Sequence, residues 1–451
     1  MTTKQSQSDM LHGPMMWKIV LFALPLAATS ALEQIFNSVD VAVVGRFASS
    51  EALAAVGANA PVINLFITLV VGISLGANAI LSNFIGQKDN EGISRGVQTT
   101  LLMGLVMGIL FMLCGLLVAK PMLTAIDTPR EVLNDAVLYL RIYFVGMPFL
   151  VIFNFCSAIF RSMGDTRRPL YILIVAGVVN TILNLIFVIM FHLGVAGVAI
   201  ATSIANALSA AIVGYLLTKE QGAFRLHLRG MRLYKREMRR ILKIGVPAGI
   251  QGMVFAVSNI IIQSEINSYG PYAVAGSAAA LNFEYYCYYI ISAFNGAAIT
   301  FIGQNYGAGK MDRVRSVYRI CMGWALVLSC VANLFFVFLR PFFLSLFSTD
   351  PQVYQYGSER MLIVLTVQWI ACSYEVSASA LRGMGISIPP TVLVILGTCV
   401  LRVAWVYLVC PAWHSFGALM TVYPVSWAVT GVLVFTMFML VMKRVEREGC
   451  I

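Results

Sequence analysis

Charged side chains are scarce in this chain of 451 residues. Asp, Glu, Lys and Arg make up 11% of it, whereas soluble domains usually carry about 25%. Hydrophobic residues make up 59%, and the mean hydropathy is +0.83. So little polar surface cannot cover an exterior that faces water. The composition therefore predicts a membrane protein whose main solvent is lipid.

The usual signatures of catalysis and metal binding are also missing. The nine cysteines include no CxxC pair and lie mostly in apolar runs, which is typical of small buried side chains rather than of disulfides or metal ligands. The four histidines are scattered, and neither HExxH nor GxxxxGK(S/T) occurs. We therefore expect a protein that is not an enzyme and that has no metal site and no cofactor.

Apolar runs long enough to cross a membrane occur twelve times. A spanning helix needs roughly 20 apolar residues, and runs of that length are separated by charged or Gly- and Pro-rich breaks. The expected spans of the first half are 16–43, 52–83, 93–118, 132–160, 169–191 and 194–217. Those of the second half are 241–268, 272–303, 314–339, 353–381, 390–410 and 416–441. The expected fold is an all-α membrane protein.

The basic residues favour one orientation of these spans. With the N-terminus in the cytoplasm, 24 of the 31 lysines and arginines fall on the cytoplasmic side. Cytoplasmic loops carry such an excess of Lys and Arg, so we expect both termini inside a bacterial cytoplasmic membrane. The net charge of +11 then follows from orientation and gives no reason to expect a nucleic-acid partner.

The second half of the chain repeats landmarks of the first. Phe84-Ile85-Gly86-Gln87 returns as Phe301-Ile302-Gly303-Gln304, and Pro25 returns 222 residues later as Pro247. The repeat predicts a six-helix lobe over 1–217, a basic linker over 218–240 and a second lobe over 241–451. Because six is even, the lobes share one orientation and should be related by an axis along the membrane normal, with a cavity between them. Such twelve-span repeats are typical of transporters.

Several segments together resemble one transporter family. Pro25 followed by Val39-Asp40 and Val44-Gly45-Arg46 is similar to the first-helix signature of the multidrug and toxic compound extrusion (MATE) family. Tyr139-Leu140-Arg141-Ile142 and Phe160-Arg161-Ser162-Met163-Gly164-Asp165-Thr166 add to the likeness. The resemblance covers nearly the whole chain and is nearest to the DinF-like bacterial branch. It implies two six-helix lobes, an outward-opening V-shaped cavity and cation-coupled export of organic compounds, often cations.

Two positions depart from the NorM-like branch of that family. Its members have an acidic residue eight positions after the seventh-helix proline, where this chain has Phe255. They also have an aspartate where this chain has Ala371, with Glu375 one turn on. The resemblance therefore favours a cation site in the N-terminal lobe.

Charged side chains in the first span are candidates for ion coupling, because burying charge in a membrane is costly. Glu33, Asn37 and Asp40 stand at i, i+4 and i+7 and so share one helical face. Asp40, which lies on the family motif, is the main cation-coupling candidate, and Glu33 is a second. Alternatively, Asp40 pairs with Arg46, and Glu33 only hydrogen-bonds neighbouring helices. Pro25 removes a backbone donor and is the expected hinge.

Polar side chains of the fifth and sixth spans are expected near Asp40. Asn180 and Asn184 stand at i and i+4 and so share a face. By the resemblance, they and Thr202 converge on Asp40 to form the cation-coupling cluster. The alternative is that they serve only as interhelical hydrogen bonds, which asparagine and threonine commonly make in membranes.

A substrate cavity is expected to be lined by Gln251, Glu284, Tyr285 and Glu375 of the C-terminal lobe and by Asn37. Carboxylates can pair with an organic cation, and aromatic faces bind one through cation–π attraction. Tyrosine is also common as a packing residue, so this assignment has a structural alternative.

The leading hypothesis is an antiporter that exports amphipathic organic cations by alternating access. The alternative is a flippase for lipid-linked oligosaccharides from the same superfamily, whose cavities tend to carry several basic residues. Here at least five carboxylates lie within spans against Arg141, Arg360 and Arg402, which favours a cationic cargo; they include Glu33, Asp40, Glu265, Glu284 and Glu375. A proton needs only one carboxylate, so we expect a proton gradient as the energy source, with sodium at most a modest competitor. The expected partners are small organic cations, protons or sodium and the bilayer, and we expect a monomer.

Overall fold

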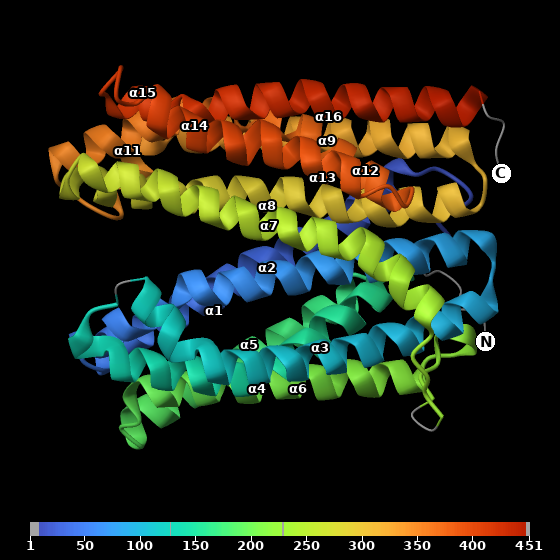
Figure 1. Ribbon diagram of the computed structural model, residues 1–451, viewed down its shortest axis with the longest axis horizontal. Coiled ribbons are helices and arrows are strands. Elements are labelled where there is room, and N and C mark those ends of the chain that lie inside the picture. Colours follow the sequence, from blue (N-terminus) through green and yellow to red (C-terminus); the bar gives the residue numbers. More distant parts are fainter. Residues whose placement is uncertain (1–8, 127, 228–229, 448–451) are drawn as a thin grey trace. The chain divides into compact units, whose positions relative to one another are not determined.

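The computed structural model describes residues 9–126, 128–227 and 230–447, which form helices without a strand (Figure 1). Twelve helical segments are long and apolar enough to cross a membrane, which confirms the predicted twelve-span all-α fold. Those of the first half are α1 (Met16–Phe47), α2 (Ser50–Gln87), α3 (Asn90–Ala125), α4 (Arg130–Ser162), α5 (Arg167–Leu185) with the π-helical η1 (Ile186–Met190), and α6 (Gly194–Lys219). A short 3-10 turn, η2 (Gly222–Phe224), follows α6.

The later spans of the second half are interrupted. After α7 (Lys235–Ser268), α8 (Pro271–Gly307), α9 (Met311–Phe338) and α10 (Arg340–Ser345), the tenth span consists of α11 (Pro351–Val364), the 3-10 segment η3 (Leu365–Ala371) and α12 (Cys372–Gly383). The eleventh joins α13 (Ile388–Val394), the π-helical η4 (Ile395–Val400) and α14 (Leu401–Leu408), and the twelfth joins α15 (Phe416–Met420) and α16 (Val422–Arg447). Such π-helical turns are frequent at functional positions.

The chain divides into two compact units that exchange the beginnings of two helices. Of the described residues, the first unit comprises Asp9 and Ala28–Gly249, and the second comprises Met10–Ala27 and Ile250–Arg447. α1 and α7 therefore each begin in one unit and end in the other. The lobes expected from the repeat place the whole of α1 in the first lobe. Packing divides it instead, because its first turns bury their side chains in the second unit.

Both changes of unit fall just after a proline. Pro25 precedes the boundary in α1, and Pro247 precedes the boundary in α7. Proline removes a backbone hydrogen bond and clashes with the preceding turn, so it permits a bend at this place. The two prolines of the repeat thus stand at equivalent points of the exchange.

Hydrogen bonds fix the residues that precede α1 and α7, the two helices that pass from one unit to the other. In the second unit, the carbonyl oxygen of Met10, just before α1, accepts from Asn305 Nδ2 at 3.1 Å and from Arg313 Nη2 at 3.2 Å. In the first unit, the backbone N–H of Tyr234, just before α7, donates to Thr99 Oγ1 at 3.3 Å. Each helix is therefore tied, before it begins, to the unit in which its first residues pack.

Within the first unit, α2 and the beginning of α7 approach each other through glycines. A Cβ atom on Gly72 would lie 2.2 Å from the backbone nitrogen of Gly249, and one on Gly76 would lie 2.4 Å from the carbonyl oxygen of Ile241. A Cβ atom on Gly245 would similarly lie 2.6 Å from the Cα atom of Ile73. Small residues four apart allow helix backbones to come this close. This contact is termed the glycine seam.

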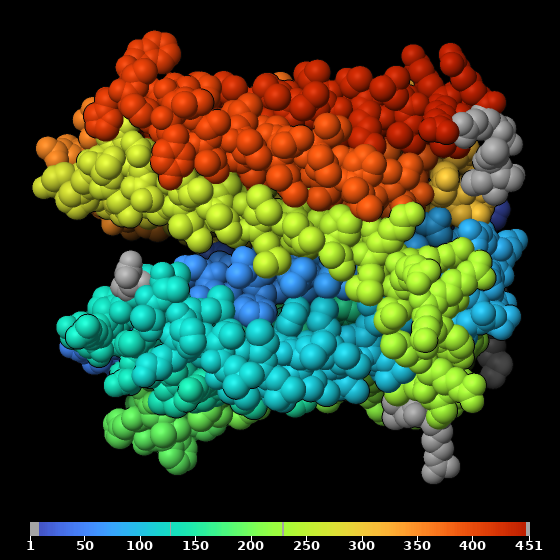
Figure 2. Space-filling view, in the orientation of Figure 1, coloured from blue at the N-terminus to red at the C-terminus, as the bar shows by residue number. Residues whose placement is uncertain are grey.

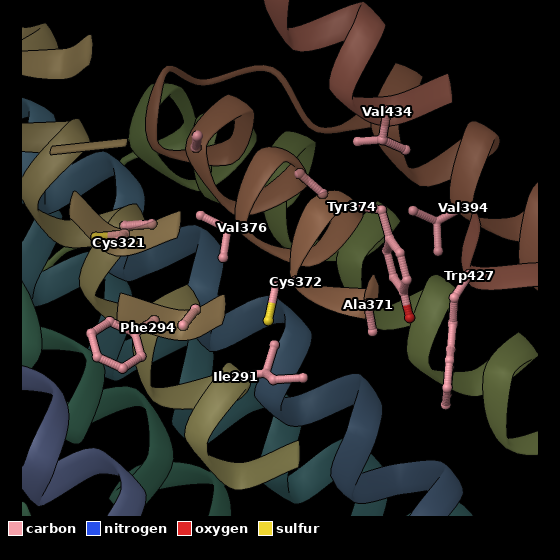
Figure 3. Packing of buried hydrophobic residues seen from close by; sticks show 14 of the residues in the cluster. Ile291, Phe294, Cys321, Ala371, Cys372, Tyr374, Val376, Val394, Trp427 and Val434 are labelled. Carbon is pink, nitrogen blue, oxygen red and sulfur yellow. The ribbon is translucent and has the colours of Figure 1, made fainter. Parts of the chain in front are cut away.

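The core of the second unit is built mainly by the eighth, ninth, tenth and twelfth spans. Ile291 and Phe294 of α8 belong to the same buried cluster as Cys372 of α12, and Figure 3 shows them from close by. Tyr374 of α12 and Trp427 of α16 are buried in this cluster as well. Lipid is as apolar as this core, so the cluster holds the helices together through close van der Waals packing rather than through removal of apolar surface from water. The cluster thereby fixes the helices that carry the polar residues described below.

Large apolar side chains remain on the outside of both units. Leu117 of α3 is 79% exposed, Phe338 of α9 is 73% exposed and Leu408 of α14 is 74% exposed. Side chains of α13, α14 and α16 cover one face of the second unit (Figure 2, orange to red). Lipid accommodates an apolar exterior of this kind, whereas water would not. The chain is therefore a multi-pass membrane protein.

Candidate functional site

Four polar side chains of the first unit form a closed ring of contacts, termed the Asp40 ring. Asp40 of α1 accepts from Asn184 Nδ2 at 2.5 Å, and the same nitrogen lies 3.2 Å from Asn180 Oδ1. Asn180 Nδ2 donates to Thr202 Oγ1 of α6 at 3.3 Å, and Thr202 Oγ1 lies 3.5 Å from Asp40 Oδ2. The structure thus brings together the four residues that the resemblance placed in one cluster.

The Asp40 ring leaves room for one more bound proton. Thr202 has a single hydroxyl hydrogen, and its oxygen already lies 2.9 Å from the carbonyl oxygen of Val198. With that hydrogen donated to Val198, a protonated Asp40 Oδ2 can in turn donate to Thr202 Oγ1. Asn184 is fully buried, and its Oδ1 atom has no hydrogen-bond partner among the described residues. The ring therefore combines one carboxylate with neutral groups that can donate or accept.

Glu33 and Asn37 lie on α1 but outside the Asp40 ring. Both side chains are exposed on the first unit. The opposite charge that acts most on Glu33 is that of Arg161 in α4, although no direct ion pair joins the two in the described part of the chain. Arg161 Nε and Nη2 are buried without a hydrogen-bond partner there. Glu33 is thus placed to interact electrostatically with Arg161, two turns from Asp40.

In the second unit, Glu375 of α12 belongs to a separate polar network. Its Oε2 atom accepts from Asn295 Nδ2 at 2.8 Å, and its Oε1 atom accepts from the hydroxyl of Tyr288 at 3.3 Å. Arg382, at the end of α12, donates to Gln251 Oε1 of α7 at 2.7 Å. Glu375 and Gln251, both expected to line the substrate cavity, therefore lie in one unit, but each already has a polar partner.

Glu284, another expected cavity residue, is held in a buried ion pair. Arg360 of α11 donates to its two carboxylate oxygens through Nε at 2.6 Å and through Nη2 at 2.9 Å, and donates to Ser277 through Nη1 at 2.5 Å. Both oxygens of Glu284 are thus occupied. The neighbouring Tyr285 is 43% exposed and stacks on Tyr289, with ring centroids 6.5 Å apart. Of these residues, Tyr285 is the one that presents a free face.

Arg360 and Arg402 are polar residues that the sequence analysis did not place at a site. Arg402 of α14 donates to Ser426 Oγ at 3.1 Å and to Asn259 Oδ1 at 3.3 Å, and its guanidinium lies 4.5 Å from the ring centroid of Tyr423. In the sequence, each of them is an arginine inside an apolar run, and a charged residue within a membrane span indicates a function by default. The identity of the partners was not readable, because they lie on other helices.

The described residues offer no obvious catalytic centre. Among them, no group of three His, Cys, Asp or Glu side chains could hold a metal ion. Gly72-Ile73-Ser74-Leu75-Gly76 has the letters of the GxSxG motif of serine hydrolases, but it lies inside α2 rather than at a strand-to-helix turn. The hydroxyl of Ser74 donates to the carbonyl oxygen of Val71 at 2.8 Å. The buried charges within the spans therefore remain the main functional candidates.

Known proteins share both the sequence pattern and the fold. A model of the MatE family matches residues 25–186 and again 247–408. "Probable multidrug resistance protein YpnP" of Bacillus subtilis is 28% identical over 368 residues, which cover 81% of this chain and 80% of the relative. An FAD transporter of Shewanella oneidensis is 26% identical over 322 residues, covering 70% and 71%. The crystal structure of MATE in the bent conformation superposes with a TM-score of 0.91 at 19% identity, covering 98% of this chain and 99% of that one.

Proposed function

This chain belongs to the MatE family of multidrug efflux transporters, and from that premise we propose that it exports amphipathic organic cations in exchange for protons. The family match covers both halves, and relatives named as multidrug resistance proteins are matched over most of their length. The observation that carries the coupling proposal is the Asp40 ring. It is a lone carboxylate among amides and a hydroxyl inside a membrane span, where a charge is costly unless it is neutralised.

The geometry of the Asp40 ring favours a proton over sodium. A hard cation such as sodium prefers several oxygen ligands, by analogy with the oxygen cages of other hard cations. Here Asn184 directs its amide nitrogen, a donor, toward both Asp40 and Asn180. A proton on Asp40 needs no such cage, because Thr202 Oγ1 can accept the hydrogen bond that the protonated carboxyl donates. One carboxylate with adaptable neutral neighbours therefore supports proton exchange.

Whether the cargo is a cation or an anion has to be inferred from this chain's own residues. One relative is named an FAD transporter, and FAD is anionic because of its phosphates. In this chain, Glu33 is exposed on α1, and Tyr285 presents an aromatic face on α8. Carboxylates and aromatic faces attract organic cations. They support the proposal of a cationic cargo, moved by alternating access with both chain termini in the cytoplasm.

The test is transport by purified protein in proteoliposomes loaded with a fluorescent organic cation. A pH gradient alone, in sodium-free buffer, should drive movement of the dye, and collapsing the gradient with nigericin should stop it. Protein-free liposomes report the passive leak. Lack of transport under the pH gradient, with recovery when a sodium gradient is imposed, would reverse the assignment of the ion.

A further inference from the structure

Two arginines are buried to a similar depth in the second unit, but in the described chain only one of them is paired with a carboxylate. Arg360 is 2% exposed and is neutralised by both carboxylate oxygens of Glu284. Arg402 is 1% exposed and takes part in no ion pair within the described residues. Its acceptors there are Ser426 Oγ and Asn259 Oδ1, both uncharged. No carboxylate in that part of the chain neutralises Arg402, so it keeps its full charge. A guanidinium also carries five N–H donors, so Arg402 has donors to spare for a further ligand.

Aromatic rings flank Arg402 without cancelling its charge. The guanidinium lies 4.5 Å from the ring centroid of Tyr423 and 5.0 Å from that of Phe255. Ring faces attract a cation through their quadrupole, but they carry no net negative charge. A buried charge without a counter-ion is strongly destabilising, so a cation kept in this position within a span indicates a function.

The repeat places Arg402 at a position equivalent to the Asp40 ring. The two segments matched by the family model are offset by 222 residues at both ends. Counted from those ends, Asn180 corresponds to Arg402, and Asp40 corresponds to Ile262, which is 1% exposed and apolar. Inside the matched segments the spacing shifts, since Phe84 returns as Phe301 after 217 residues. The three contributing elements also correspond, since α1, α5 and α6 supply the ring, and α7, α14 and α16 supply Asn259, Arg402 and Ser426. The two units thus hold opposite charges at equivalent places.

Arg402 is itself buried, but its partner Asn259 is accessible on the surface of the unit. Asn259 is exposed and Phe255 is half-buried, and the two stand four residues apart on one face of α7. Asn259 contacts Arg402 Nη1 at 3.3 Å, a long hydrogen bond that an incoming oxygen can replace. Arg402 is the second residue after the π-helical η4, a type of irregularity that often marks functional positions.

We propose that Arg402, with Ser426 and Asn259, forms an anion-binding site that takes the carboxylate of a transported amphiphile. The guanidinium binds a carboxylate through parallel charge-assisted hydrogen bonds, and the rings of Phe255 and Tyr423 pack against the apolar body. The identity of the occupant rests on the proposed export function. The cargo then includes zwitterions and organic carboxylates as well as plain cations.

Binding is tested first, without any gradient, with sodium benzoate as the probe and the neutral isostere benzamide as its control. The melting temperature of detergent-purified protein is measured at constant ionic strength. Benzoate should stabilise the wild-type protein more than benzamide does. Arg402→Gln should raise the benzoate Kd at least tenfold, since it removes the guanidinium. Phe255→Glu should do the same with Arg402 left in place, because it supplies a competing internal carboxylate.

Two controls make this measurement decisive. Gln263→Glu adds the same charge two turns further along α7, away from the Arg402 contacts, and should leave benzoate binding unchanged. Equal stabilisation by benzoate and benzamide in the wild type, or benzoate binding that neither variant weakens, would overturn the proposal. Phosphatidylglycerol is tested in parallel. Stabilisation by this lipid but not by benzoate, in an Arg402-dependent way, would make the site a lipid site and overturn the assignment to cargo.

Transport then separates this inference from the proposed function. Rhodamine 110 has a free carboxylate, and rhodamine 123 is its methyl ester. In proteoliposomes, Phe255→Glu should slow export of rhodamine 110 at least tenfold more than it slows export of rhodamine 123, because the ester has no carboxylate for Arg402 to bind. Equal effects on the two dyes would overturn the inference while leaving the export function intact. Failure of the wild type to move either dye, with Arg402-dependent benzoate binding preserved, would overturn the export function and leave the anion site standing.

Discussion

The two units differ most at the positions that the repeat makes equivalent. The first unit holds one carboxylate, Asp40, among neutral amides and a hydroxyl. The second unit holds one guanidinium, Arg402, among neutral groups at the corresponding place, while its carboxylate Glu284 is bound to Arg360. The two halves thus carry opposite charges on helices that correspond in chain order. The two proposals accordingly assign exchange of a small cation to the first unit and recognition of part of the cargo to the second.

If the two units differ in this way, substitution of Asp40 should have the largest effect on transport. Asp40→Asn should abolish gradient-driven export, because an amide cannot take up and release the coupling proton, while the amount of folded protein in the membrane stays normal. Dye transport in proteoliposomes under a pH gradient measures this. Glu375→Gln in the second unit is the matched variant and should keep gradient-driven transport, although substrate affinity changes. Loss of coupling in Glu375→Gln with retention in Asp40→Asn would exchange the roles of the units.

The same substitution in the two buried arginines should destabilise the protein in one case but not in the other. Arg360→Met leaves Glu284 buried without its partner and should lower the free energy of unfolding by about 3–5 kcal/mol. Arg402→Met removes a buried charge that lacks a carboxylate and should leave the stability unchanged or raise it. Thermal unfolding in detergent without added anions compares them. If both variants lose the same stability, Arg402 is as firmly paired as Arg360, and the contrast between the two is wrong.

The glycine seam should make the first unit sensitive to a single methyl group. Gly72→Ala places a Cβ atom 2.2 Å from the backbone of Gly249, so the helices must separate, and overpacking of this kind costs about 1–3 kcal/mol. Gly57→Ala in the same helix is the control, because no atom lies within 4 Å of its added Cβ. Thermal stability of the two variants should differ accordingly. Equal melting temperatures would show that α2 and α7 can move apart freely.

The smallest expected effects concern the two prolines. Pro25→Ala should slow turnover several-fold and leave substrate affinity nearly unchanged, because it alters the bending of α1 and removes no contact to cargo. Pro247→Ala in α7 should act in the same direction, since it stands at the equivalent point. Transport rate and dye affinity, measured separately on each variant, test this. A change in affinity without a change in rate would place Pro25 at the binding site and remove it as a hinge.

Much of this architecture is readable from the sequence, because its signals are local. Apolar runs mark the twelve spans, and the spacing of Asn180 and Asn184 marks a shared helical face. The position of Asp40 relative to these residues followed from the family resemblance. The ion pair of Glu284 with Arg360 was not readable, because its members lie 76 residues apart and no periodicity links them. Glu284 was therefore expected to face the cargo, whereas packing buries it against a guanidinium.

The exchange of helix beginnings between the units also bears on how the protein is made. The glycine seam of the first unit needs Gly249, so it cannot close until synthesis has passed the linker and reached the middle of α7. The segment at Met10 is made among the first, yet it reaches its partners Asn305 and Arg313 only when most of the chain exists. Two identical six-helix chains that swap the first part of one helix produce the same arrangement. Fusion of such a domain-swapped pair yields a single chain in which neither half is complete alone.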